Sequence, residues 1–173
     1  MKKLLSNLML YIICIPISAQ NWTKDMAKDI LTEPKVAVVV NLEDAKIMGV
    51  SLKDFPLYYS GKFESNETHA NLILEKFEKN FIEGFFKYTQ RIPVNVEEAL
   101  YVITYKFLEI DEDGGFSGFY YVMQGDNKSR DLPFKQKKGR WNNFEELLIE
   151  NTKTYWKSAS KKEWGNRYNM FLY

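Results

Sequence analysis

The strongest constraint on the fold is a pair of alternating segments, residues 99–110 and 116–124, joined by the acidic and glycine-rich stretch Asp111–Gly115. Side chains of a β-strand point alternately to the two faces of a sheet, so each segment is predicted to be a strand with one apolar side. Asp and Gly suit a tight turn between antiparallel strands, because such a turn needs positive φ. The pattern therefore predicts a β-hairpin.

The same acidic run could instead hold calcium. An EF-hand loop needs oxygen ligands at its first, third and fifth positions, glycine at the sixth and glutamate at the twelfth. Counted from Asp111, the last three of these positions hold Gly115, Phe116 and Val122. We therefore interpret the stretch as a turn and predict no metal site and no cofactor.

Two amphipathic helices are predicted around the hairpin. From Asn66 to Tyr88, apolar side chains recur every three or four residues, which is typical of a helix with one buried face. A second helix is predicted from Asn143 to about Ser160, because Asn-Phe-Glu-Glu at its start is a capping arrangement. The buried side predicted for this second helix comprises Phe144, Leu147, Leu148, Asn151 and Tyr155.

The first strand is predicted at Lys35–Val40, and its nearly continuous apolar character favours a strand covered on both faces or lying centrally in a sheet. Ser51–Asp54 has the form of a capping box, which predicts a short helical turn that ends at Pro56. With a further strand at 132–136, the order is strand, helix, strand, strand, strand, helix. This order predicts an α+β fold, a small and mainly antiparallel sheet with two helices packed on one face.

The first 19 residues have two lysines, a short apolar run and Ile-Ser-Ala, the order of a secretory signal peptide. The remainder is divided into a loosely ordered lead-in, residues 20–34, and a single domain, residues 35–173. Cys14 follows two isoleucines, whereas a lipid-attachment cysteine normally follows a small residue, so lipoprotein anchoring is disfavoured. We expect a periplasmic or secreted protein without a transmembrane segment in its mature chain.

Charge and cysteine content exclude several function classes. Loss of Lys2 and Lys3 with the leader changes the net charge from +1 to −1, so no overall positive field attracts nucleic acid. Cys14 is the only cysteine, so the mature chain is predicted to lack disulfides, a catalytic thiolate and cysteine-ligated metals.

Catalytic motifs are absent from the sequence. The only histidine, His69, lies at a helix start without a serine scaffold nearby, which favours a surface role. Acidic pairs occur at Glu97–Glu98, Glu145–Glu146 and Asp111/Asp113, but a glycosidase needs two carboxylates facing each other across a cleft. We expect a non-enzymatic protein and keep a carboxylate-dependent hydrolase as the least favoured alternative.

Two groups of residues are candidate binding sites. The aromatic strand residues could line a groove for a sugar or an apolar ligand, or could simply fill the core; they are Tyr101, Tyr105, Phe119 and Tyr121. A basic patch could bind an anionic group, or could be a solvated edge strand; it contains Lys137, Lys138, Arg140 and Trp141. The apolar C-terminal segment from Trp164 to Tyr173 either packs on the domain or contacts a partner.

The stretch Ala45-Lys46-Ile47-Met48-Gly49-Val50-Ser51-Leu52-Lys53-Asp54-Phe55 resembles a pattern in a group of secreted bacterial envelope proteins of unknown function. In that group the preceding strand usually ends in an acidic residue and an aromatic, where this chain has Asn41-Leu42. The layout is also loosely similar to that of envelope lipoproteins that assist transport machinery. The resemblance implies export and an accessory or binding role with another envelope protein; a small-molecule or glycan binder is the alternative.

Overall fold

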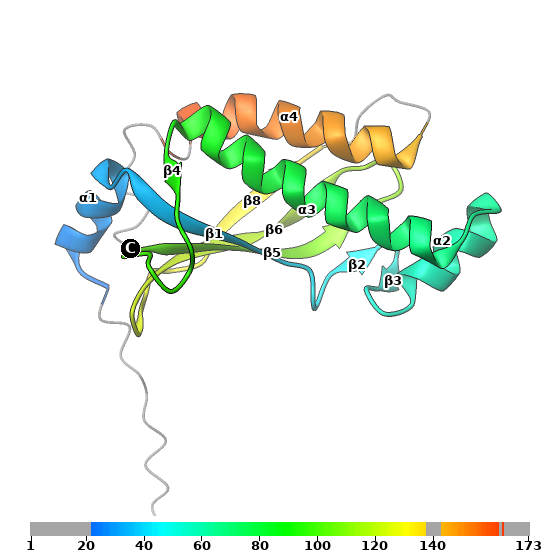
Figure 1. Cartoon of the computed structure of the whole chain (residues 1–173), viewed down its shortest axis with the longest axis horizontal. Coiled ribbons are helices and arrows are strands. Elements are labelled where there is room, and N and C mark those ends of the chain that lie inside the picture. The colour runs from blue at the N-terminus through cyan, green and yellow to red at the C-terminus, as the bar shows by residue number, and fades with distance from the viewer. Residues whose placement is uncertain (1–21, 138–142, 163, 165–173) are drawn as a thin grey trace, which may run out of the picture.

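The computed structural model describes residues 22–137, 143–162 and 164, and within them it confirms the α+β class, with four helices and a mostly antiparallel sheet of eight strands (Figure 1). The helices are α1 (Lys24–Thr32), α2 (Phe55–Phe63), α3 (Glu67–Thr89) and α4 (Phe144–Lys162). The strands are β1 (Lys35–Asn41), β2 (Lys46–Ile47), β3 (Val50–Ser51), β4 (Ile92–Pro93), β5 (Val102–Ile110), β6 (Phe116–Gln124), β7 (Asn127–Lys128) and β8 (Leu132–Gln136).

The predicted hairpin is confirmed and forms the centre of the sheet. Strands β5 and β6 are antiparallel, β8 lies beyond β6, and β1 and β2 run one after the other along the opposite side of β5, parallel to it. The expectation that β1 is central or covered on both faces is wrong. It lies near the sheet edge, where β4 pairs only with Lys35 and Val36, and helices cover one of its faces. Val38 and Val40 of β1 pack against the core under α3, whereas Val39 points to the uncovered face of the sheet.

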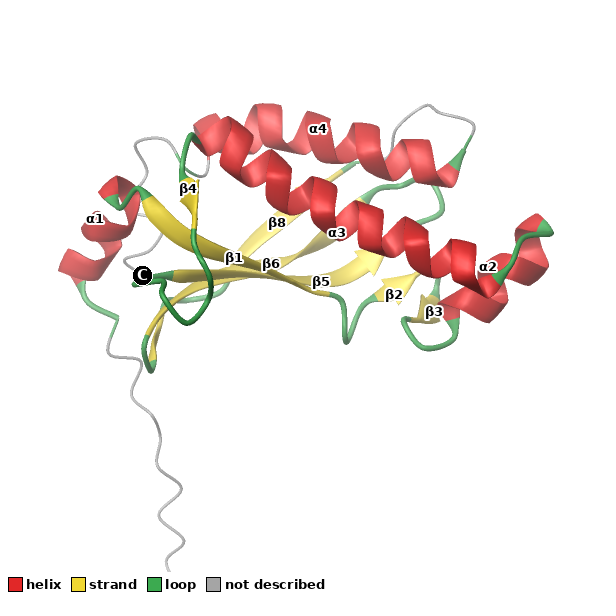
Figure 2. Cartoon of the chain, viewed as in Figure 1, coloured by secondary structure: helices red, strands yellow, loops and turns green. Residues whose placement is uncertain are grey.

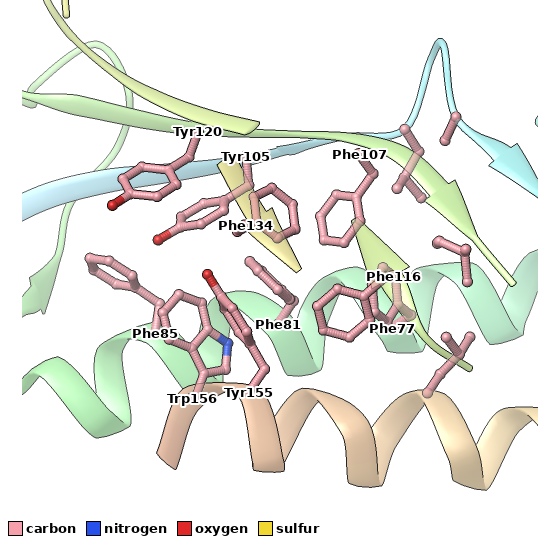
Figure 3. Packing of buried hydrophobic residues seen from close by; sticks show 14 of the residues in the cluster. Phe77, Phe81, Phe85, Tyr105, Phe107, Phe116, Tyr120, Phe134, Tyr155 and Trp156 are labelled. Atoms are coloured by element: carbon pink, nitrogen blue, oxygen red, sulfur yellow. The ribbon is translucent and has the colours of Figure 1, made fainter. Parts of the chain in front are cut away.

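Helices α3 and α4 lie side by side on one face of the sheet, as predicted (Figure 2). Their aromatic side chains meet those of β5 and β6 in a fully buried cluster (Figure 3). Phe81 is at its centre, with ring centroids 5.0 Å from Tyr105 and 4.9 Å from Trp156. Each such ring stabilises the fold by roughly 1.5–3 kcal/mol through removal of apolar surface from water.

A β-bulge in β5 was not predicted from the alternating pattern. Phe107 pairs with Gly118 and Glu109 with Ser117, so Leu108 is an extra residue on one strand. Strict alternation would turn Glu109 inward; the bulge instead leaves Glu109 exposed and buries Ile110 completely. Gly118 is required here, because a Cβ atom would lie 2.1 Å from the carbonyl oxygen of Lys106.

The hairpin turn is docked against α4. Asp111 accepts a hydrogen bond from the Gly115 N–H at 2.8 Å, and Gly114 has a φ of +67°. The side chain of Asn151 donates to the Gly114 carbonyl at 2.8 Å within the buried interface. The acidic side chains remain exposed, and Glu112 forms an ion pair with Lys62 at 2.6 Å. The acidic stretch is therefore a structural turn, and Gly114 permits its close approach to α4, because a Cβ atom there would lie 2.6 Å from Leu147 Cβ.

Two helices near the N-terminal side differ from expectation. The lead-in, predicted to be loosely ordered, contains α1, whose Ala27 and Ile30 are fully buried in the core. Helix α2 begins where the sequence predicted an end, with Pro56 in its first turn. Proline is favoured there because its missing N–H would have no partner inside the helix. The predicted capping box is present only in part: Ser51 Oγ accepts a hydrogen bond from the Asp54 N–H at 3.3 Å and donates one to Asp54 Oδ2 at 2.6 Å. The residue that caps α2 is Asp54 and not Ser51.

Candidate functional site

The face of the sheet opposite α3 and α4 is the candidate functional site, and we call it the open face (Figure 2). Residues paired in register share a face, so Val39, Thr104 and Tyr121 form one row across three strands. Neighbouring rows add half-exposed side chains, Val102 with Met123 and Lys106 with Phe119. In the described part of the chain no helix covers this surface.

Phe119 and Tyr121 form an aromatic platform on the open face. Their ring centroids are 6.4 Å apart with the planes inclined by 31°. Lys128 Nζ lies 4.1 Å from the centroid of the Tyr121 ring, a cation–π contact, and also pairs with Asp131 at 2.7 Å. A flat aromatic surface with a polar tip and a cation at its side suits recognition of a protein surface or a sugar ring.

Lysines border the platform. Lys106 pairs in register with Phe119 and its Nζ lies 2.5 Å from Asp44 Oδ2, a hydrogen bond that raises the pKa of the Lys106 ammonium. Lys135 is exposed on β8, opposite Ser117. The site therefore combines an apolar centre with a charged border, the usual composition of a surface that binds and releases a partner.

The other two predicted aromatic residues lie in the core, on the opposite face from Phe119 and Tyr121. Tyr105 is fully buried and stacks on Tyr120 with centroids 5.0 Å apart, and Trp164 Nε1 donates to its hydroxyl at 2.9 Å. The four aromatic residues thus do not line one groove. Alternation groups Tyr101 with Tyr105 and Phe119 with Tyr121, but it does not say which sides of the two strands share a face. The pairing register, with its bulge at Leu108, turns the two pairs to opposite faces.

Tyr101 anchors α1 to the sheet. Its hydroxyl donates to Asp29 Oδ2 at 2.9 Å, and the Trp22 ring packs on it edge-on at 6.2 Å. Burial, together with the hydrogen bond to the Asp29 carboxylate, raises the pKa of Tyr101 far above its ordinary value. A tyrosine that stays protonated in this way is suited to holding a helix and unsuited to acting as a base.

The basic patch is described only in part. Lys137 is exposed directly after β8, whereas Lys138, Arg140 and Trp141 lie outside the described residues. The final segment also lies outside them, apart from Trp164, which is 8% exposed and packs against Phe85 with centroids 5.2 Å apart. At least the first residue of that segment packs back on the domain.

Two of the residues considered for catalysis, Glu145 and His69, lie at helix starts and take part in contacts that stabilise the fold. Glu145 pairs with Lys76 of α3 at 2.6 Å, and its N–H donates to Asn143 Oδ1 at 2.9 Å, as the capping interpretation predicts. The N–H of His69 donates to Asn66 Oδ1 at 2.7 Å at the start of α3. Its side chain borders a hollow of about 290 Å³ beside Tyr59 and Phe144. No group of three metal-ligating side chains occurs among the described residues.

Comparison with known proteins adds no relative. No protein-family model matches the chain, and no curated protein is significantly similar to it. Of the helices in the described ranges, none combines the length and the apolar character that crossing a membrane requires.

Proposed function

We propose that this chain is an exported bacterial envelope protein whose single domain is non-enzymatic and binds another envelope protein through the open face. The signal-peptide pattern of residues 1–19 supports export. The observation that carries the binding role is the largely apolar open face around Val39 and Tyr121, on a sheet whose other face is packed under α3 and α4. The accessory role implied by the resemblance to secreted envelope proteins agrees with this proposal.

Physical reasoning favours a protein partner over a solvated face. Antiparallel sheets with one face in water normally alternate apolar residues inside with polar residues outside. Here the outward side chains in the rows from Val102 to Lys106 are mostly apolar, with Asn41, Thr104 and Lys106 as the polar exceptions. The apolar ones are Val39, Val102, Phe119, Tyr121 and Met123. Such a contiguous apolar surface on an exported protein is typical of an interaction site.

A glycan is the second candidate ligand, because the inclined rings of Phe119 and Tyr121 could stack on a sugar. Thermal unfolding with a panel of soluble glycans separates the two functions. A ligand present at 100 times its Kd stabilises the fold by about 2.7 kcal/mol, which is easily measured. Saturable stabilisation by one glycan, abolished in Tyr121→Ala, would replace the protein-binding proposal.

Site-specific photo-crosslinking tests the main proposal. A photoreactive phenylalanine analogue is placed at Tyr121 in one variant and, as a control, at Lys79, whose side chain is 73% exposed on the outer side of α3. We expect a discrete crosslinked envelope protein at position 121 alone, lost when Val102→Lys is added. Equal labelling at both positions would contradict the proposal.

Export is tested separately by mass spectrometry of the exported chain, which should have Gln20 as its first residue.

A further inference from the structure

The outer edge of β1 carries backbone groups without a strand partner. Ala37 N–H donates to the carbonyl of Tyr101, the residue before β5, at 3.1 Å, so the backbone groups of Val38 and Val40 point in the opposite direction. On that outer side, Val94 N–H donates to the Val36 carbonyl at 3.2 Å, and the described chain provides no strand beside the residues that follow. Figure 1 is viewed toward this edge, with α3 above it.

The part of the β1 edge that has no partner strand in the described chain is bounded at both ends. Strand β4 closes it at Val36, and β3 occupies the corresponding position beside β2, which pairs at Lys46 and Ile47. The free stretch, residues 37–41, is long enough for about five residues of an extended chain, about 17 Å. The N–H and C=O groups of Val38 and Val40 offer four hydrogen bonds to such a chain.

The opposite edge of the sheet is protected and this one is not. Strand β8 carries Pro133, which lacks an N–H, and the exposed Lys135, two devices that discourage addition of another strand. Residues 36–40 of β1 are Val-Ala-Val-Val-Val, without charge or proline. Exposed apolar residues stand nearby, Ile92 at 51% and Val96 at 48% exposure.

The flank of α3 above this edge adds a charge. Helical periodicity places Glu78 and Ile82 on the side of α3 away from α4, while α3 packs against β1. Glu78 is half-buried, and its burial, with the neighbouring Glu75 carboxylate, raises its pKa. Among the described residues no lysine or arginine forms an ion pair with Glu78. A cation supplied by a bound chain would complement it.

We propose that the outer edge of β1 binds an extended segment of a partner protein as an added strand, with alternate apolar side chains and a lysine or arginine that meets Glu78. Main-chain hydrogen bonds to Val38 and Val40 supply the attachment, and side chains pointing toward Ile82 supply the selectivity. The remaining side chains of the segment extend the open face next to Val39. The proposal concerns a surface distinct from the Tyr121 platform and stands without it.

The test uses NMR titration of the ¹⁵N-labelled mature chain with a defined peptide, acetyl-Lys-Thr-Val-Thr-Val-Thr-Lys-amide. Its lysines and valines share one face in either strand direction. We expect saturable shifts and slowed hydrogen exchange at the Val38 and Val40 amides. An otherwise identical peptide with glutamates in place of both lysines should bind at least fivefold more weakly, because it meets Glu78 and Glu75.

A pair of substitutions at Val40 tests the main-chain hydrogen bonds. Val40→Pro deletes an outward N–H that the fold does not use, whereas Val40→Thr keeps it with a side chain of similar shape. We expect about tenfold weaker peptide binding for the proline variant and unchanged binding for threonine. A peptide N-methylated at its central residues should also fail to bind, which supplies the same test should Val40→Pro not fold.

Three results would overturn the proposal. The first is the absence of saturable shifts at Val38 and Val40, and the second is equal binding of the N-methylated peptide. The third is concentration-dependent shifts of these amides without peptide, accompanied by a dimer in light scattering, which would mean that a second copy occupies the edge. None of these results affects crosslinking at Tyr121, so the two proposals fail separately.

Discussion

Tyr120 and Tyr121 are adjacent in β6 and have opposite roles. Tyr120 is fully buried and stacks on Tyr105, whereas Tyr121 is half-exposed on the open face with Lys128 over its ring. The two faces of the sheet are built from similar apolar and aromatic residues. Their difference arises from α3 and α4, which cover one face only, so residue type alone does not distinguish a core from a binding surface.

Removing a ring from the covered face should have the largest effect. Phe81→Ala deletes a fully buried side chain that contacts rings from β5 and α4, and we expect a loss of about 3–5 kcal/mol in the free energy of unfolding. Urea unfolding monitored by circular dichroism measures it. A loss below about 1 kcal/mol would mean that the covered face is not a packed core.

A glycine on the covered face should also be intolerant of a methyl group. Gly118→Ala places Cβ against the Lys106 carbonyl oxygen, and we expect about 1–3 kcal/mol of destabilisation. Gly61→Ala in α2 is the matched control, because no atom lies within 4 Å of its added Cβ. Helix propensity predicts that the control is stabilised by up to about 1 kcal/mol. Equal effects of the two changes on the urea midpoint would contradict the bulge geometry.

The same kind of truncation on the open face should leave the fold nearly intact. Tyr121→Ala removes a half-exposed ring, so we expect a loss of at most about 1 kcal/mol in stability. The variant should nevertheless lose the partner detected by crosslinking from a neighbouring position such as Val102. Unimpaired crosslinking, or destabilisation as large as that of Phe81→Ala, would remove the distinction between the two faces.

The smallest expected change in stability is that of a substitution at Glu78, on the flank of α3 above the β1 edge. Because burial raises the pKa of Glu78, the folded state binds its proton more tightly than the unfolded state does. The resulting contribution to stability is present in acid and lost as the pH rises through the folded-state pKa. Glu78→Gln should therefore slightly raise the thermal midpoint at neutral pH. This rise of the thermal midpoint should vanish at a pH below that at which carboxylates ordinarily titrate. Glu75→Gln, at an exposed position, should raise the midpoint less.

Local patterns predicted most elements and much of the core. The alternation in residues 101–107 grouped the side chains that β5 buries, although a groove remained the alternative, and the repeat from Ala70 to Phe85 identified the buried side of α3. These predictions succeeded because periodicity reflects which side of one element is apolar. The bulge at Leu108 escaped notice, because it depends on the partner strand and on Gly118.

The candidate site was predicted only in part. Phe119 and Tyr121 were named, but they were grouped with Tyr101 and Tyr105, which the structure places in the core. Val39, Thr104 and Lys128 were missed, although register across the sheet brings them beside Tyr121 or over its ring. Alternation along each strand could not separate the two groups, because the register and the bulge at Leu108 decide which sides of β5 and β6 share a face. Which group remains uncovered required knowing where the helices lie.

The sequence by itself determined the α+β class, the hairpin, the two long helices and the buried side of each, since these depend on residues close together in the chain. Tertiary structure alone decided that β1 stands near an edge beside β5, that α1 packs into the core and that one face stays open. The reason is physical: strand order and helix placement depend on contacts between distant segments, such as Ala37 with Tyr101, which compete globally and leave no local periodicity.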